Sequence, residues 1–264
     1  MRPDFFDIHS HIQLPEFDSD RDAVIQRLRE QNTWTITVGT DKESSKKAVE
    51  STQLFSGIFA AIGQHPTDDS EAIFDESFYS QLATDPKTVA IGECGLDYFR
   101  AKDDSREEKK RQKEIFESHI ELSLTHNKPL MVHCRDAYED VLDILELRHK
   151  EAGGNLKGNV HFFAGNVDIA RRFLSIGFTC SFTGVITFTP DYDEVISYIP
   201  LESILSETDS PFVAPVPFRG KRCEPSFVSY VVERISQIKN ISLDEAKKAM
   251  VDNAFRVFPL SSLH

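Results

Sequence analysis

Two histidines with one residue between them lie near the start of the chain, where residues 5–11 read FFDIHSH. Side chains alternate along a β-strand, so a strand here directs His9 and His11 to the same side. Each buried imidazole needs partners for two nitrogens, and a metal ion together with hydrogen-bond acceptors supplies them. A pair of hydrogen-bonded core histidines is the alternative, so the interpretation depends on ligands elsewhere.

Further potential ligands follow later apolar segments of the chain. Each lies at or just beyond the carboxyl end of a predicted strand: Glu93, His133, His161 and Asp209. Each one alone has an ordinary explanation, as a satisfied core imidazole, a helix cap, a salt-bridge partner or the acceptor that begins a turn. The recurrence of such residues at equivalent strand ends favours a metal centre.

Short apolar segments alternate with longer amphipathic ones along the whole chain. Strands are expected at 5–11, 34–39, 58–63, 89–93, 130–133, 158–162, 178–183 and 203–209, and helices at 18–31, 43–55, 74–83, 105–127, 138–150, 167–176, 191–198, 225–239 and 243–257. This order favours one α/β domain over residues 1–264, a (β/α)8 TIM barrel, with an open doubly wound sheet as the alternative. In a barrel the carboxyl ends of all strands share one mouth, which would bring the ligands together.

Composition limits the classes of function. The 264 residues are 40% hydrophobic and 28% charged, with a net charge of −13, which argues against a basic surface that wraps duplex DNA. The cysteines form no Cys-x-x-Cys pair, so neither a zinc knuckle nor a disulfide framework is indicated. Without a signal-like or membrane-length apolar run, we expect a soluble cytoplasmic protein, with a nuclear location left open, and no membrane partner.

The ligand types indicate the chemistry of the centre. Two ions need a bridging oxygen ligand, and Glu93 can bridge with its two carboxylate oxygens while the histidines and Asp209 complete the shells. Mixed imidazole and carboxylate ligands suit zinc, manganese, iron or nickel better than magnesium. Two ions roughly 3.5–4 Å apart activate water at neutral pH and stabilise charge on a phosphoryl or carbonyl oxygen. Hydrolysis is the expected class of reaction.

Several motifs together resemble the TatD family of metal-dependent hydrolases, within the amidohydrolase-like barrels. They are DIHSH at 7–11, IGQHP at 62–66, IGECGLDY at 91–98, HCRDA at 133–137, ETDSP at 207–211, PVPFRGKR at 215–222 and NAFRVF at 253–258. The resemblance implies a TIM barrel with two divalent ions (Zn, Mn, Mg or Ni) and deoxyribonuclease activity, with 3′-to-5′ exonucleolytic trimming of single-stranded ends.

The resemblance also implies roles for individual residues. Asp209 is the candidate for orienting or deprotonating the attacking water, and His65 for contacting a phosphate or donating a proton to the leaving group. The alternative for His65 is a turn histidine fixed by Pro66. One ion would be held by His9, His11, Glu93 and Asp209, and the other by Glu93, His133 and His161.

Other residues are candidates for substrate contacts. Arg135 can bind a phosphate bidentately, or else form a salt bridge with a neighbouring Asp136 or Glu139. Tyr98, with the adjacent phenylalanine, can stack on a base at the rim or simply cover the barrel end. Lys221 can meet a phosphate backbone, or lie in a solvated loop.

Two positions depart from the family pattern. The segment HFFAG at 161–165 stands where the family more often has cysteine after the histidine and serine before the glycine, and Cys223 stands where asparagine is common. Because cysteine is a poor N-cap, either another group satisfies the amides of the following helix or the loop before it is arranged differently. Neither departure changes a metal ligand, whereas both affect how a substrate would fit.

The sequence thus predicts a monomeric metal-dependent nuclease whose substrate is single-stranded DNA ends. Hydrolysis of an amide or ester, for example in an aminoacyl-tRNA, is the alternative, because the same centre polarises a carbonyl equally well. An adaptor built on a decayed barrel is disfavoured because every ligand position is retained.

Overall fold

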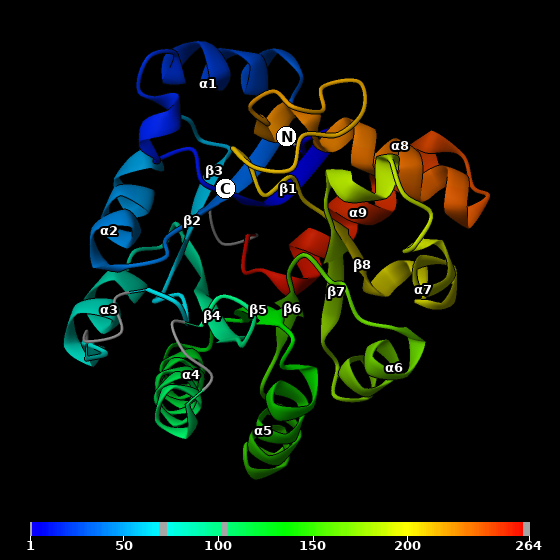
Figure 1. Ribbon diagram of the computed structural model, residues 1–264. Coiled ribbons are helices and arrows are strands. Elements are labelled where there is room, and N and C mark those ends of the chain that lie inside the picture. The colour runs from blue at the N-terminus through cyan, green and yellow to red at the C-terminus, as the bar shows by residue number, and fades with distance from the viewer. Residues whose placement is uncertain (1, 69–72, 102–104, 261–264) are drawn as a thin grey trace.

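A computed structural model describes residues 2–68, 73–101 and 105–260. Its eight strands are parallel and follow one another around the sheet in chain order. Their bounds are β1 Phe5–Ser10, β2 Thr33–Val38, β3 Ile58–Ile62, β4 Thr88–Asp97, β5 Leu130–Arg135, β6 Gly158–Val160, β7 Thr179–Phe182 and β8 Ile204–Ser206. The helices surround this sheet (Figure 1).

The sheet closes just past the end of β8. The N–H of Asp209 donates to the carbonyl of His9 at 2.9 Å, and the N–H of His11 donates to the carbonyl of Ser210 at 2.7 Å. The Asp7 carboxylate, fully buried on β1, accepts hydrogen bonds from the N–H (2.9 Å) and hydroxyl (2.6 Å) of Thr208. The prediction of a (β/α)8 barrel is confirmed, and the open-sheet alternative is wrong.

The predicted helices are present with bounds shifted by a few residues. They are α1 Arg21–Glu30, α2 Lys42–Ser51, α3 Glu76–Ala83, α4 Arg106–His126, α5 Tyr138–Glu151, α6 Val167–Ser175, α7 Asp193–Tyr198, α8 Val228–Lys239 and α9 Leu243–Val257. The segment predicted as one helix from residue 225 begins as a 3₁₀ turn, Pro225–Phe227.

Local capping explains the bounds of α4, the helix that matters most for the site. The hydroxyl of Ser105 accepts the N–H of Glu108 at 3.0 Å, satisfying a free amide of the first turn. At the other end, Asn127 adopts the left-handed conformation with φ of 50°, as expected of a C-terminal cap. Between these residues the helix runs for 21 residues along β4 and β5.

Every strand ends one to four residues from the expected position, and three of these ends bear on the site. β4 continues to Asp97 rather than ending at Glu93, because its register against β5 shifts between Ile91 and Cys94 and pairing then resumes. β8 ends at Ser206, three positions before Asp209, whose φ of 58° cannot belong to a strand. β6 is likewise only Gly158–Val160, so His161 follows it directly.

Within the described part of the chain, no helix is both long enough and apolar enough to cross a membrane.

Candidate metal centre

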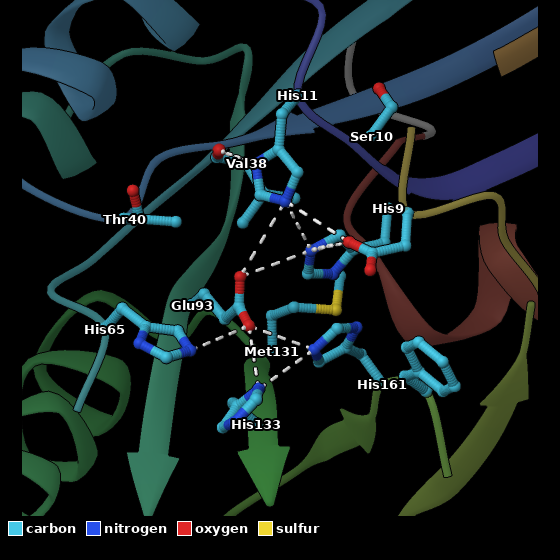
Figure 2. Close-up of polar contacts among 12 residues, drawn as sticks. His9, Ser10, His11, Val38, Thr40, His65, Glu93, Met131, His133 and His161 are labelled. Carbon is cyan, nitrogen blue, oxygen red and sulfur yellow. Dashed lines mark hydrogen bonds and ion pairs between the residues drawn. The ribbon is translucent and has the colours of Figure 1, made fainter. Parts of the chain in front are cut away.

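The predicted ligands meet at the carboxyl ends of the strands. Figure 2 shows His9, His11, Glu93, His133 and His161 pointing toward one another from β1, β4, β5 and the end of β6. Among the described residues, three groups have potential ligand atoms within 4.8 Å of one another, and the first two share His9: His9, Glu93 and His161; His9, His11 and Asp209; and His65, Asp97 and His133.

One part of the cluster, the β1/β8 half, consists of His9, His11 and Asp209. The Nε2 atoms of His9 and His11 are 3.2 Å apart. Oδ1 of Asp209 lies 3.4 Å from Nε2 of His11 and 3.8 Å from Nε2 of His9. The three side chains therefore aim nitrogen and oxygen donors at a common point.

The other part, the β5/β6 half, consists of His133 and His161. Nδ1 of His133 lies 3.3 Å from Nε2 of His161. Both atoms approach Oε1 of Glu93, at 2.9 Å and 3.0 Å respectively. This half is therefore another convergent set of donors.

Glu93 lies between the halves and divides its oxygens between them. Whereas Oε1 faces the β5/β6 half, Oε2 lies 3.4 Å from Nε2 of His9 and 3.9 Å from Nε2 of His11. Burial raises the pKa of this carboxyl, but the surrounding histidines, His161 foremost, hold it well below its usual range. An ionised carboxylate in this position has the geometry of a bridging ligand.

Partners on the outer side of the rings, hydrogen-bonded to His11 and His133 and in ion-pair contact with His161, set which nitrogen faces the centre. The carbonyl of Val38 can only accept, so the Nδ1–H of His11 donates to it at 2.7 Å and Nε2 keeps its lone pair. Nε2 of His133 lies 3.0 Å from Oδ2 of Asp97, which leaves Nδ1 as the inward lone pair. Nδ1 of His161 lies 3.3 Å from Oε1 of Glu207.

Asp97 and Glu207 are the functional residues that sequence reasoning missed. Both are buried, and Glu207 is fixed by the hydroxyl of Ser181 at 2.6 Å and the N–H of Phe162 at 2.7 Å. Their signal was available, because each carboxylate belongs to a quoted motif and stands four residues after Glu93 or two residues before Asp209.

The donor set fits divalent cations. Since the Nδ1–H of His11 is committed to Val38, its Nε2 lone pair faces the imidazole of His9 only 3.2 Å away. Nδ1 of His9 is buried and has no hydrogen-bond partner among the described residues. Converging lone pairs beside an ionised carboxylate are stabilised by a cation, and imidazole with carboxylate is a common ligand set for transition metals.

His65 faces the same centre but, unlike His11 and His133, carries its hydrogen on the inward nitrogen. Its Nδ1 accepts the N–H of Thr67 at 3.2 Å, so the neutral ring carries its hydrogen on Nε2, 3.5 Å from Oε1 of Glu93. Burial, and then repulsion by His133, lower the pKa of His65 to about 3. His65 therefore presents a neutral N–H donor to the cavity rather than a lone pair.

A cavity of about 640 Å³ opens above these residues, and Arg135 and Arg100 are among its lining residues. The guanidinium of Arg135 stacks on the ring of Phe99 at 3.8 Å. Among the described carboxylates none pairs with Arg135, and Glu139 binds Arg172 instead, so the salt-bridge alternative is not observed there. Arg135 is therefore placed to meet a ligand in the cavity.

Two predicted substrate contacts are not brought into the cavity. The hydroxyl of Tyr98 donates to the carboxylate of Asp140 at 2.6 Å, and the ring does not line the cavity. Its neighbour Phe99, 61% exposed, does not line the cavity either, but its ring stacks on Arg135, which does. Lys221 also lies outside the lining residues, with its Nζ 6.0 Å from the ring centre of Phe218.

A parallel (β/α)8 barrel whose carboxyl-end mouth gathers imidazoles and carboxylates has the architecture of a metal-dependent hydrolase. The family model described as TatD related DNase matches residues 6–259. The chain is 38% identical to the uncharacterized metal-dependent hydrolase YabD of Bacillus subtilis, covering 97% of this chain and 99% of that protein. It is 32% identical to the uncharacterized metal-dependent hydrolase YcfH of Escherichia coli K12, with 97% and 96% covered.

The similarity of the fold to solved structures indicates the same family. The crystal structure of YjjV, a TatD homologue from Escherichia coli K12, superposes with a TM-score of 0.88 at 25% identity, over 98% of this chain and 99% of that one. The chain therefore belongs to the TatD family of metal-dependent hydrolases.

Proposed function

We propose that this hydrolase cleaves phosphodiester bonds of DNA and trims single-stranded DNA from the 3′ end. The observation that carries the proposal is the position of Glu93, whose two oxygens face separate sets of donors below a cavity lined by Arg135. Two-ion centres of this kind suit phosphoryl transfer, because both the attacking and the leaving oxygen need stabilisation.

His9, His11, Asp209 and one oxygen of Glu93 would hold one ion, and His133, His161 and the other oxygen would hold the second. When bound, divalent ions lower the pKa of water and stabilise negative charge on the phosphoryl group. The excess of imidazole over carboxylate favours zinc, manganese or nickel over magnesium.

Asp209 is proposed to accept the proton of the attacking water. Burial raises the pKa of its carboxyl, but the hydrogen bond with His11 and the other surrounding histidines hold it below its usual range. The carboxylate is thus available as a base, and it lines the cavity with 15% of its side chain exposed. A base must reach both water and solvent-accessible substrate, which this position allows.

His65 and Arg135 are proposed to bind the phosphate. The Nε2–H of His65 would donate a hydrogen bond to a non-bridging oxygen, a role that suits a neutral ring better than transfer of a proton to the leaving group. Arg135 would add a charge-assisted contact. Phe99, rather than Tyr98, would stack on a terminal base, because its ring is exposed beside Arg135.

Hydrolysis of an amide or ester is the second candidate. The observation that favours it is the apolar part of the cavity wall, formed by Leu14, Phe162, Phe212 and Val213. Such a wall suits a small apolar group beside a carbonyl.

The deciding experiment is degradation of single-stranded oligonucleotides labelled at the 3′ or the 5′ end. Protein stripped with a chelator receives Mg²⁺, Mn²⁺ or Zn²⁺ in turn, and Asp209→Ala is the control. Stepwise loss from the 3′ end that depends on metal and is absent in Asp209→Ala is the expected result. No cleavage with any metal, although two ions are bound, would transfer the assignment to amide or ester hydrolysis.

A further inference from the structure

Helix α4 buries polar side chains on the face that packs against the barrel. Residues 108, 112, 115 and 119 are spaced by three or four positions and therefore share one face. That face of a helix in a barrel is normally apolar. Here Gln112 and His119 are both fully buried.

His119 binds the backbone next to His65. Its Nδ1–H donates to the carbonyl of Ile115 at 2.8 Å, since a carbonyl can only accept. Nε2 is therefore unprotonated and accepts the N–H of Gln64 at 2.9 Å. Phe74 packs on the ring at 4.5 Å between centroids, which leaves His119 little freedom to move.

Arg111, on the same helix, binds the other side of His65. Its Nη2 donates to the carbonyl of Pro66 at 2.6 Å. The carboxylate of Glu108 fixes the guanidinium with contacts of 2.8 Å and 2.7 Å. Helix α4 thus contacts the residue before His65 and the residue after it.

Gln112 binds the end of β4 in the same way. Its Oε1 accepts the N–H of Asp97 at 2.9 Å, and its Nε2 donates to the carbonyl of Asp97 at 3.1 Å. Asp97 in turn faces Nε2 of His133. One helix face therefore fixes the backbone that presents His65 and the backbone that presents the partner of His133.

We propose that the polar face of α4, defined by Glu108, Arg111, Gln112 and His119, positions His65 relative to the metal ligands, and that His119 is a positioning residue for His65. The backbone N–H of Gln64 donates to Nε2 of His119, and this hydrogen bond joins the helix to the turn that carries His65. Without that acceptor the buried N–H must seek a new partner, and the turn that carries His65 shifts. The consequence for turnover rests on the proposed function, whereas the consequence for the His65 ring does not.

The test compares His119→Leu, which removes the acceptor, with His119→Gln, whose amide oxygen can accept the same N–H. His119→Asn, polar but shorter, replaces the leucine variant if that variant does not fold. His149→Leu is the matched control. His149 is also a helical histidine, and its Nδ1 lies 3.0 Å from the carbonyl oxygen of Leu156, but it stands in the last turn of α5.

Two readouts are measured on zinc-loaded protein. The ¹⁵N signals of the His65 ring are expected to be well separated in the wild type, with the hydrogen on Nε2, and to converge in His119→Leu as the tautomers mix. kcat/KM on the oligonucleotide is expected to fall roughly thirtyfold in His119→Leu, with zinc content unchanged, since small displacements of a contacting group are costly. His119→Gln and His149→Leu should stay within about twofold of wild type.

Unchanged ¹⁵N signals of His65 in a folded His119→Leu or His119→Asn protein would overturn the proposal. So would an equal loss in His119→Gln, because its acceptor is retained. If the wild type cleaves no oligonucleotide, the proposed function fails while the ring signals still decide the role of His119.

Discussion

The two halves of the centre hold their histidines by different means. In the β5/β6 half each ring has a carboxylate behind it, Asp97 for His133 and Glu207 for His161. In the β1/β8 half, His11 has the carbonyl of Val38 behind it. Nδ1 of His9 and Nδ1 of His161 both lack a hydrogen-bond partner among the described residues, but only His161 has a carboxylate, that of Glu207, 3.3 Å from this atom.

The difference in basicity is confined to one ring of each half, since the pKa values of His11 and His133 are both raised. Burial lowers the pKa of both His9 and His161. For His161 the carboxylates of Glu93 and Glu207 outweigh burial and hold the pKa well above its usual value, whereas repulsion by His161 adds to burial at His9. A carboxylate behind a histidine raises its basicity as a ligand. We therefore expect the β5/β6 half to hold its ion more tightly, and the β1/β8 half, which contains Asp209, to present the water.

The largest effect is expected when the residue shared by the halves is removed. Glu93→Ala should lose metal from both halves and lower turnover at least about a thousandfold, because neither set of donors keeps its central carboxylate. Metal content by mass spectrometry and turnover on the labelled oligonucleotide are the measurements. Glu146→Ala, which removes a carboxylate paired with Arg172 on the outer helices, is the control. Wild-type metal content in Glu93→Ala would refute the bridging role.

A variant in one half should weaken the binding of one ion and leave the other ion unaffected. Glu207→Gln removes the charge behind His161 and keeps an oxygen for the N–H of Phe162. We expect about tenfold to hundredfold weaker binding of one ion, with the other unchanged, in a competition titration against a chromophoric chelator. Glu224→Gln, in an ion pair with Arg27, is the matched control. Equal weakening of both ions would show that the halves are not independent.

The protonation of His65 can be tested by a pH profile. Because the pKa of His65 is lowered to about 3, the ring is already neutral at pH values well below 7. His65→Gln should therefore lower kcat/KM about thirtyfold, by the same factor at every pH between about 6 and 9, as expected for a lost hydrogen bond to a charged group. Loss of a basic limb in the variant would instead identify His65 as a proton donor.

The smallest effect is expected at the rim beside the β5/β6 half. Arg135→Ala should raise KM for the oligonucleotide about tenfold and leave kcat and metal content nearly unchanged, since the guanidinium contributes binding rather than chemistry. Arg171→Ala, an exposed arginine paired with Asp168 on α6, is the control. An unchanged kcat/KM in Arg135→Ala would exclude a phosphate contact.

The outcome at particular residues shows what a sequence can predict. His9, Glu93 and His133 were identified because a rigid parallel strand directs side chains by a simple alternation, and the barrel joins the strand ends in one mouth. The predicted end of β4 was wrong because the register shift depends on pairing with β5, and the local sequence does not reveal that pairing. Tyr98 and Phe99 were both candidates for a rim contact, because neither residue type reveals that Asp140 binds the tyrosine hydroxyl.

The sequence by itself determined the order of strands and helices and the ligand types, because both follow from local periodicity and from the chemistry of each side chain. Only the tertiary structure decided which nitrogen of each histidine faces inward. That choice depends on acceptors distant along the chain, such as Val38 for His11 and Glu207 for His161. It also decided that His65 is a donor held by α4, because a hydrogen bond between separate elements exists only once they are packed.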